Sequence, residues 1–164
     1  MSSAKDKEEK NVRVAIRCRP LNEREKKQNK AVVVQCRPNK SEVTLRKKTY
    51  TFDHVFGQYA TQKEVFKGII QPVVTEALDG YNCTVFAYGQ TGTGKTHTIQ
   101  GHLDPEHELA GIIPRAVRFI FDYLQQHYQD YSVRVSYLQL YNEVRILHST
   151  KVTCGTHEIP QGIK

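Results

Sequence analysis

A glycine-rich turn, GQTGTGKT over residues 89–96, constrains this chain more than any other feature of its sequence. It matches the pattern G-x-x-x-x-G-K-[ST], in which glycines let backbone N–H groups turn inward around phosphate oxygens. A nearly continuous apolar run, residues 82–88, precedes the turn, and a helix is predicted to begin near Gly94. This order of buried strand, glycine turn and helix start is the one that a phosphate site requires. The sequence therefore predicts a phosphate-binding loop in an α/β fold.

The loop side chains have expected roles of their own. Lys95 would reach the β- and γ-phosphates of a bound nucleotide, and the Thr96 hydroxyl would be a magnesium ligand. His97 directly follows the loop and could flank a base, although a lone histidine is more often a helix-surface residue. The predicted nucleotide-binding residues of this stretch are Gly89, Gln90, Thr91, Gly92, Thr93, Gly94, Lys95, Thr96 and His97.

A second candidate group lies near the start of the chain. Arg17 and Arg19 project from one face of a strand predicted over residues 12–19, which Pro20 ends. Ligands of open α/β sheets gather outside the carboxyl ends of the strands, so this pair could border the same pocket. A solvated edge-strand face explains the same two residues equally well.

The remaining segments alternate between the strand period of two and the helix period of 3.6. A helix is predicted over residues 62–79, with a kink at Pro72 and a stop at Gly80. Another begins near Pro114. Residues 21–31 are predicted to be a charged loop, and strands are predicted at 31–36, 42–46, 50–56, 131–141 and 144–147. This order predicts an α/β sandwich, with a mixed central sheet flanked by helices.

Composition limits the classes of function. The net charge of +7 favours acidic partners, namely nucleotide phosphate, nucleic acid or an acidic protein surface, without choosing among them. The four cysteines are scattered, which argues against a disulfide framework or a zinc site and favours a reducing compartment. No apolar run is long enough to span a bilayer, and the first ten residues lack the apolar core of a secretory signal.

A phosphate loop alone does not make an enzyme. A P-loop hydrolase also needs an acidic residue near the metal and a group that positions water. No carboxylate after Thr96 closes an apolar parallel strand, and Glu143, at the end of the 131–142 strand, is best interpreted as structural. The sequence therefore identifies no catalytic residue.

Five motifs, in matching order and spacing, together resemble the first half of a kinesin motor domain. They are RCRP (17–20), YTFDHVFG (50–57), GYNCTVFAYGQTGTGKTHTIQG (80–101), AGIIPRA (110–116) and VSYLQLYNE (135–143). The resemblance implies an incomplete P-loop NTPase fold that binds ATP and Mg²⁺ at residues 89–96. It also implies an adenine pocket lined by Arg17, Arg19 and Pro20, with His97 against the base. The implied partners are ATP and microtubules, with no nucleic acid and no membrane, and the implied location is the cytoplasm, the cytoskeleton and the mitotic spindle.

Within that family the chain looks most like the bipolar mitotic kinesins, although only residues 102–109 stand where those motors carry a long insert. After Glu143 the sequence lacks the family's switch motifs, main microtubule-binding helix and neck linker, and it has no heptads for a coiled coil. The expected division is a disordered leader (1–10), a partial motor domain (11–147) and an irregular, divergent tail (148–164). A truncated gene model, a retained intron or a splice variant would each produce this pattern.

The predicted function is the ATP-binding part of a microtubule motor that is not catalytically competent by itself. The alternative is a non-catalytic nucleotide-binding or protein-interaction fragment. A GTPase is disfavoured because NKSE, at 39–42, precedes the loop and ends in glutamate, and a helicase would need a second ATPase motif. In the kinesin fold both neighbours of the 82–88 strand come from the second half of the motor, so an open, marginal sheet is expected here. Directionality, cargo and oligomeric state stay open.

Overall fold

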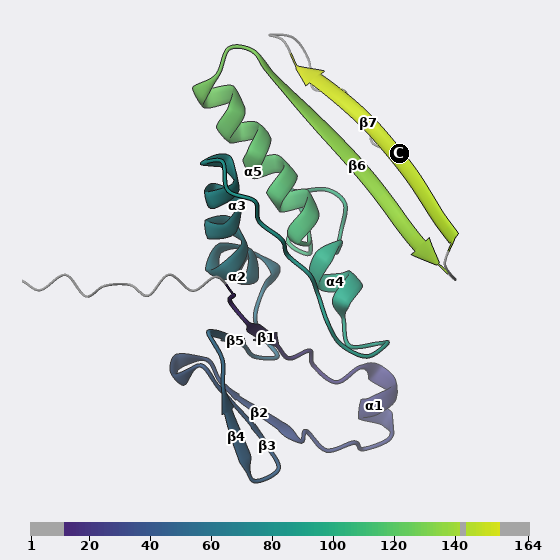
Figure 1. Cartoon of the computed structure of the whole chain (residues 1–164). Helices are drawn as coiled ribbons and strands as arrows, with labels where there is room; N and C mark the ends of the chain where they lie inside the picture. Colours follow the sequence, from purple (N-terminus) through teal and green to yellow (C-terminus); the bar gives the residue numbers. More distant parts are fainter. Residues whose placement is uncertain (1–11, 142–143, 155–164) are drawn as a thin grey trace, which may run out of the picture. The chain divides into compact units, whose positions relative to one another are not determined.

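The computed structural model describes residues 12–141 and 144–154 of the chain (Figure 1). The chain divides into two compact units, residues 1–117 and 118–164, and the division falls inside its longest helix. No helix of the described residues is long and apolar enough to cross a membrane.

A short parallel pair of strands opens the first unit. β1 (Ala15–Arg17) pairs with β5 (His54–Phe56), with Ile16 opposite Val55 (Figure 1). A parallel pair needs a crossover connection, and here the crossover carries a helix and a separate three-stranded sheet. Of the strand predicted over residues 12–19, residues 15–17 pair with a neighbouring strand.

The crossover begins with α1 (Glu23–Lys27), a helix in a stretch for which the sequence predicts a loop. The Asn22 side chain accepts a hydrogen bond from the Glu25 N–H, and the Glu25 carboxylate accepts one from the Asn22 N–H. This reciprocal pair is a capping box, which satisfies two backbone donors that the first turn would otherwise leave free. The loop prediction is wrong for these five residues, and the N-x-x-E pattern of residues 22–25 was the available signal.

A three-stranded antiparallel sheet follows α1. It contains β2 (Val34–Arg37), β3 (Glu42–Leu45) and β4 (Lys48–Thr51), with the short 3-10 helix η1 (Pro38–Lys40) between β2 and β3. The predicted hairpin of the first two strands is confirmed. The segment 50–56, predicted as a strand pair or one bent strand, instead contributes to two different sheets.

The helix predicted over 62–79 is one continuous helical segment with three parts: α2 (Gln62–Val65), the π-helical turn η2 (Phe66–Ile70) and α3 (Gln71–Leu78) (Figure 1). The sequence predicts a kink at Pro72, whose ring would press on the carbonyl four residues back. The structure has the π turn immediately before it, in which the Gln71 N–H reaches the Phe66 carbonyl. A π turn changes the local register of the helix, and this accommodates the proline.

Gly80 ends this helical segment, as predicted. Its φ of 102° lies in the left-handed region that favours glycine. The Gly80 N–H donates to the Ala77 carbonyl and the Tyr81 N–H to the Glu76 carbonyl. This pair of bonds is the Schellman arrangement that closes many helices.

The core of the first unit is small and lies where this helical segment packs on β5. Val55 of β5 and Val65, Phe66 and Ile70 of the helical segment are all buried. A Cβ on Gly68 would approach the Phe56 ring to 3.1 Å, so the glycine allows the helix to lie close to the strand.

Residues 82–88 do not form the buried strand that the sequence predicts. Every residue from 81 to 88 is exposed, with Phe86 at 82% and Tyr88 at 97%. A strand requires neighbours for its backbone groups, and among the described residues no strand pairs with this segment. The central-strand prediction is therefore wrong for this segment.

Two helices follow the glycine turn. α4 (Lys95–Ile99) begins immediately after Gly94, as predicted, and α5 (Ile112–His127) has Pro114 in its first turn. The intervening loop is closed by a bridge between Gly101 and Ala110, and Ala110 is completely buried. Residues 112–117 of α5 belong to the first unit.

The second unit contains the rest of α5 and a long antiparallel hairpin of β6 (Tyr131–Tyr141) and β7 (Val144–Cys154). Tyr131 lies opposite Cys154 in its register. β7 continues past the predicted short strand 144–147, whereas the sequence predicts an irregular tail from residue 148. The paired strand β6 explains the difference, because cross-strand pairing decides strand formation more than local pattern does. Residues 155–164 of the predicted tail, and the leader 1–10, lie outside the described residues.

The fold is thus an incomplete α/β fold with both parallel and antiparallel strand pairs. In the described part of the chain these strands form three separate sheets rather than the single central sheet that the sequence predicts.

Candidate functional site

The glycine turn between residue 88 and α4 depends on its glycines for two different reasons. Gly92 and Gly94 have φ values of 82° and 97°, in the left-handed region. An added Cβ would meet nothing at either position, so their requirement is conformational. A Cβ on Gly89 would instead lie 2.7 Å from the Thr93 hydroxyl oxygen. Glycine is needed at this position because there is no room for a side chain.

Lys95, the first residue of α4, folds its side chain back over this loop. Its ammonium donates to the carbonyl oxygens of Gly89, at 2.8 Å, and Gln90, at 2.9 Å. The Thr93 hydroxyl donates to the same Gln90 carbonyl at 2.7 Å. The loop therefore curves around a positive charge that its own backbone holds in place.

The exposed side of the loop has the groups that a polyphosphate requires. Thr91, Thr96 and His97 are exposed, and Thr96 is the second residue of α4. A loop of positive-φ glycines, an ammonium and a helix start are suited to phosphate oxygens. An exposed hydroxyl next to that ammonium is suited to a magnesium ion that accompanies the phosphates. The residues present thus fit a triphosphate with its metal ion.

Arg19 braces the loop from the side of β1. Its Nε donates to the Gly92 carbonyl at 2.9 Å, and its two terminal nitrogens donate to the two Glu25 carboxylate oxygens at 2.7 and 2.6 Å. These bonds lower the pKa of Glu25 to about 2, with a further contribution from the Asn22 N–H, and the pKa of Arg19 is raised. The pair is partly exposed, so its net contribution to stability is modest. Its structural effect is to join α1, the end of β1 and the loop. Pro20, the next residue, is exposed.

Arg17 reaches a different part of the same region. Its Nη1 donates to Gln62 Oε1 at 2.6 Å and to the Thr98 hydroxyl at 3.0 Å, and its Nη2 donates to the Ala60 carbonyl at 3.2 Å. Partial burial lowers the pKa of its guanidinium. The two arginines thus have different partners, but both contact the segment formed by the loop and α4.

His97 lies within electrostatic reach of Arg17. Partial burial lowers the pKa of the His97 imidazole, and the Arg17 charge lowers it further. Both effects favour the neutral form of the ring. The structure brings the predicted residues Arg17, Arg19, His97 and 89–96 together in one region, and their contact with a nucleotide stays a prediction.

The sequence missed two residues of this region, Glu25 and Gln62. Gln62 is buried, with 4% of its surface exposed. It lies four residues before Phe66, on the buried stripe of the helical segment. A glutamine at an apolar position of the helix period was the signal that could have identified it.

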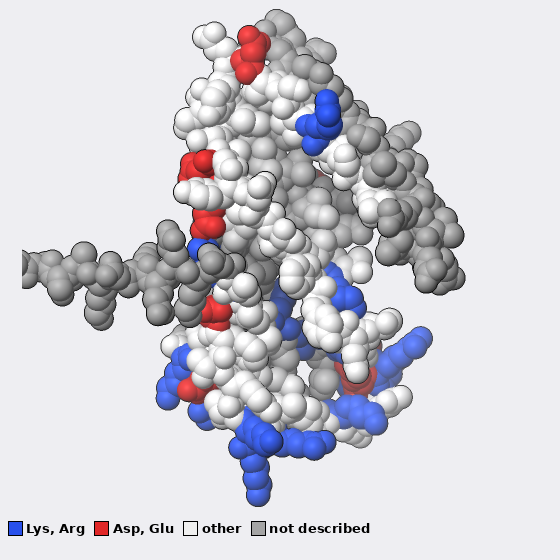
Figure 2. Space-filling view, viewed as in Figure 1, with Lys and Arg blue, Asp and Glu red and all other residues white. Residues whose placement is uncertain are grey.

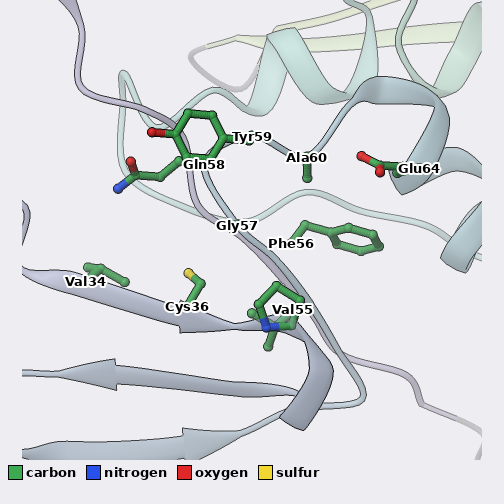
Figure 3. A pocket seen from close by; sticks show the side chains of 10 residues that line it. Val34, Cys36, Val55, Phe56, Gly57, Gln58, Tyr59, Ala60 and Glu64 are labelled. Carbon is green, nitrogen blue, oxygen red and sulfur yellow. The ribbon is translucent and has the colours of Figure 1, made fainter.

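A separate hollow of about 660 Å³ lies between β2 and the segment that joins β5 to α2 (Figure 3). Its walls are mostly apolar, with Val34, Cys36 and Phe56 among them. Burial, with a neighbouring Cys18 thiol, raises the pKa of the Cys36 thiol to about 11. Glu64 is the charged residue among the described lining groups, and its negative charge disfavours phosphate. The groups suited to phosphate therefore lie at the glycine loop and not in this hollow.

Positive charge is gathered in the part of the first unit that contains α1 and β2–β4. Lysine and arginine outnumber aspartate and glutamate over residues 22–51, and Figure 2 shows their side chains clustered at the end where Figure 1 places these elements. Such a field favours the approach of an anionic ligand.

Known proteins resemble this chain over most of its length. A family model for the kinesin motor domain matches residues 17–156, and so runs on past Glu143. Kinesin-like protein KIF11 of Xenopus tropicalis is 46% identical over 159 residues, which cover 87% of this chain and 15% of that protein. Kinesin-like protein KIN-5B of Oryza sativa subsp. japonica is 49% identical over 146 residues, or 82% of this chain and 14% of that protein. Kinesin-like protein KIF11 of Mus musculus is 47% identical over 160 residues, which cover 87% of this chain and 15% of that protein. The chain thus spans about 15% of the length of the relatives it matches.

Proposed function

The chain belongs to the kinesin motor domain family, and on that premise we propose that it carries the ATP-binding part of a microtubule motor. The observation that carries the proposal is the Lys95 ammonium held over the curved loop by the Gly89 and Gln90 carbonyls. In this arrangement the charge that would meet the β- and γ-phosphates is already at the loop. On binding, the Lys95 ammonium would exchange its two carbonyl acceptors for phosphate oxygens.

Each residue of the region has a proposed role in binding ATP. Residues 89–96 hold the triphosphate, Lys95 contacts its terminal phosphates, and the Thr96 hydroxyl holds Mg²⁺. When bound, the metal ion would neutralise charge between the β- and γ-phosphates. Arg17, Pro20 and His97 lie on the base side, and Arg19 braces the loop through Gly92.

The activity of a whole motor would need more than these residues. A hydrolase requires a carboxylate near the metal and a residue that positions water, and no carboxylate after Thr96 closes an apolar parallel strand in this sequence. We therefore expect this chain alone to bind ATP with little turnover. Within a longer protein it would serve ATP-driven movement on microtubules, in the cytoplasm and at the mitotic spindle.

Equilibrium binding of a fluorescent ATP analogue to the 164-residue chain tests the proposal. Lys95→Ala removes the ammonium and should weaken binding by at least about tenfold, because a charge-assisted contact with phosphate is lost. Lys63→Ala is the matched control, since Lys63 is also a helix lysine but is exposed on α2, and none of the loop contacts described above involves it. Equal affinity of the wild type and Lys95→Ala would refute the proposed site.

The exposed apolar segment 81–88 favours a second candidate, a non-catalytic nucleotide-binding or protein-interaction fragment. Large exposed apolar surfaces often mark places where another chain binds. ATPase assays with and without microtubules test what both candidates share, because each expects little turnover from this chain, and stimulation by microtubules would contradict both. The absence of Lys95-dependent ATP binding would leave only a protein-interaction fragment.

A further inference from the structure

Gln62 is a polar side chain that the fold buries at the first position of α2. Burial of an amide is costly unless its hydrogen bonds are made inside the protein. Its Nε2 donates to the His97 carbonyl at 2.6 Å and to the Leu109 carbonyl at 3.1 Å. Its Oε1 accepts from Arg17 Nη1 at 2.6 Å. Both donor hydrogens of the amide and its acceptor oxygen therefore have partners.

These partners permit only one orientation of the amide. Carbonyl oxygens only accept hydrogen bonds and a guanidinium only donates them, so a flipped amide would face acceptors with its oxygen and a donor with its NH₂ group. Gln62 thereby links β1, through Arg17, to α4, through His97, and to the loop before α5, through Leu109.

The acceptors around Arg17 are neutral. Gln62, Thr98 and Ala60 hold its guanidinium by oxygen atoms without charge, whereas Arg19 is paired with the Glu25 carboxylate. A neutral acceptor orients a guanidinium without cancelling its charge. A planar cation held in this way can contact the face or the acceptor atoms of an aromatic base.

We propose that Gln62 is a positioning residue for the base side of the ATP site. Its amide holds the Arg17 guanidinium beside α4 and fixes the backbone from which the His97 ring projects. The inference rests on the proposed function. It divides the site into two halves that depend on different residues. Lys95 contacts the phosphates, and Gln62 positions the groups that contact the base.

Calorimetric titration of the 164-residue chain with two probes tests this division. The probes are ATP and inorganic tripolyphosphate, each with Mg²⁺, because the second has phosphates but no base. Gln62→Leu removes all three hydrogen bonds at similar side-chain size. It should weaken ATP binding about tenfold, as expected when a bond that positions a charged group is lost, and leave tripolyphosphate binding unchanged.

Two further variants separate positioning from stability. Val65→Ala removes a buried side chain from the same helical segment without touching Arg17, and it should leave the ratio of the two affinities unchanged. Thr98→Val replaces one neutral acceptor of Arg17 by an apolar group of the same shape. It should shift the ratio in the direction of Gln62→Leu but by a smaller factor, and it tests the inference even if Gln62→Leu does not fold.

Several outcomes would overturn the inference. If Gln62→Leu or Thr98→Val weakens the binding of both probes equally, or of neither, the hydrogen bonds around Arg17 have no role specific to the base. If the wild type binds ATP and tripolyphosphate with equal affinity, the inference is wrong because the base contributes nothing to binding. The proposed function would still stand in that case if the binding depends on Lys95. If neither probe binds in a Lys95-dependent manner, the proposed function and the inference are both wrong.

Discussion

Phe86 gives a direct test of whether residues 82–88 are unpaired in this chain. Its side chain is 82% exposed, so less than a fifth of its surface is covered. Complete burial of a phenylalanine contributes roughly 2–3 kcal/mol to stability. Phe86→Ala should therefore lower the free energy of unfolding by only about 0.5 kcal/mol, because little burial is lost. In a buried central strand the same substitution would cost about 3–5 kcal/mol.

Val65→Ala is the matched comparison within the same unit. Val65 is 2% exposed, and its truncation should cost about 2 kcal/mol, since both the buried methyl groups and their packing are lost. Urea denaturation followed by far-ultraviolet circular dichroism measures both variants against the wild type. The chain has no tryptophan, so this backbone signal is preferable to fluorescence.

The Phe86 measurement should be made at low protein concentration, because exposed apolar surface favours self-association. A cost above about 2 kcal/mol for Phe86→Ala would refute the reasoning, since this is the range of fully buried side chains. A cost that appears only at high concentration would mean that a second copy covers the segment.

Three further predictions concern backbone geometry and charge. Gly94→Ala should lower stability by about 1–2 kcal/mol, because alanine is strained at a φ of 97°, and it should weaken binding of the fluorescent ATP analogue; thermal melting and titration measure the two effects. Gly101→Ala should be more severe, since its Cβ would overlap the Leu109 carbonyl and lie 2.6 Å from the Gly111 nitrogen. Loss of soluble, cooperatively melting protein is the expected result, and a normal melt would contradict the loop geometry. The pKa of Glu25 is about 2 in the folded chain against an ordinary value of 4.5, so the unfolded chain binds the proton more readily between these values. Stability from this group is present above pH 4.5 and is lost as the pH falls toward 2; Glu25→Gln should flatten the decline in urea midpoint across that window, and an unchanged decline would contradict the pairing with Arg19.

Much of the local structure follows from short stretches of sequence. The amphipathic pattern and Gly80 correctly predict the helical segment 62–78 and its end, and Pro72 marks the region of the π turn. The signal for α1 is equally local, since the capping pattern of Asn22 and Glu25 indicates a helix start, whereas the dense charges of residues 21–31 indicate a loop. These elements are predictable because their decisive contacts lie within a few residues.

The candidate site divides in the same way. By itself the sequence determined the chemistry of residues 89–96, because the glycines that adopt positive φ, the Lys95 ammonium and the Thr96 hydroxyl are consecutive along the chain. Only the tertiary structure decided that Arg17 and Arg19 take different partners, that Gln62 is buried between Arg17 and α4, and that residues 82–88 stay unpaired. Each of these outcomes depends on groups far apart in the sequence. An apolar run supplies the side chains that a buried strand needs. Whether the strand forms depends on the other strands that can pair with it.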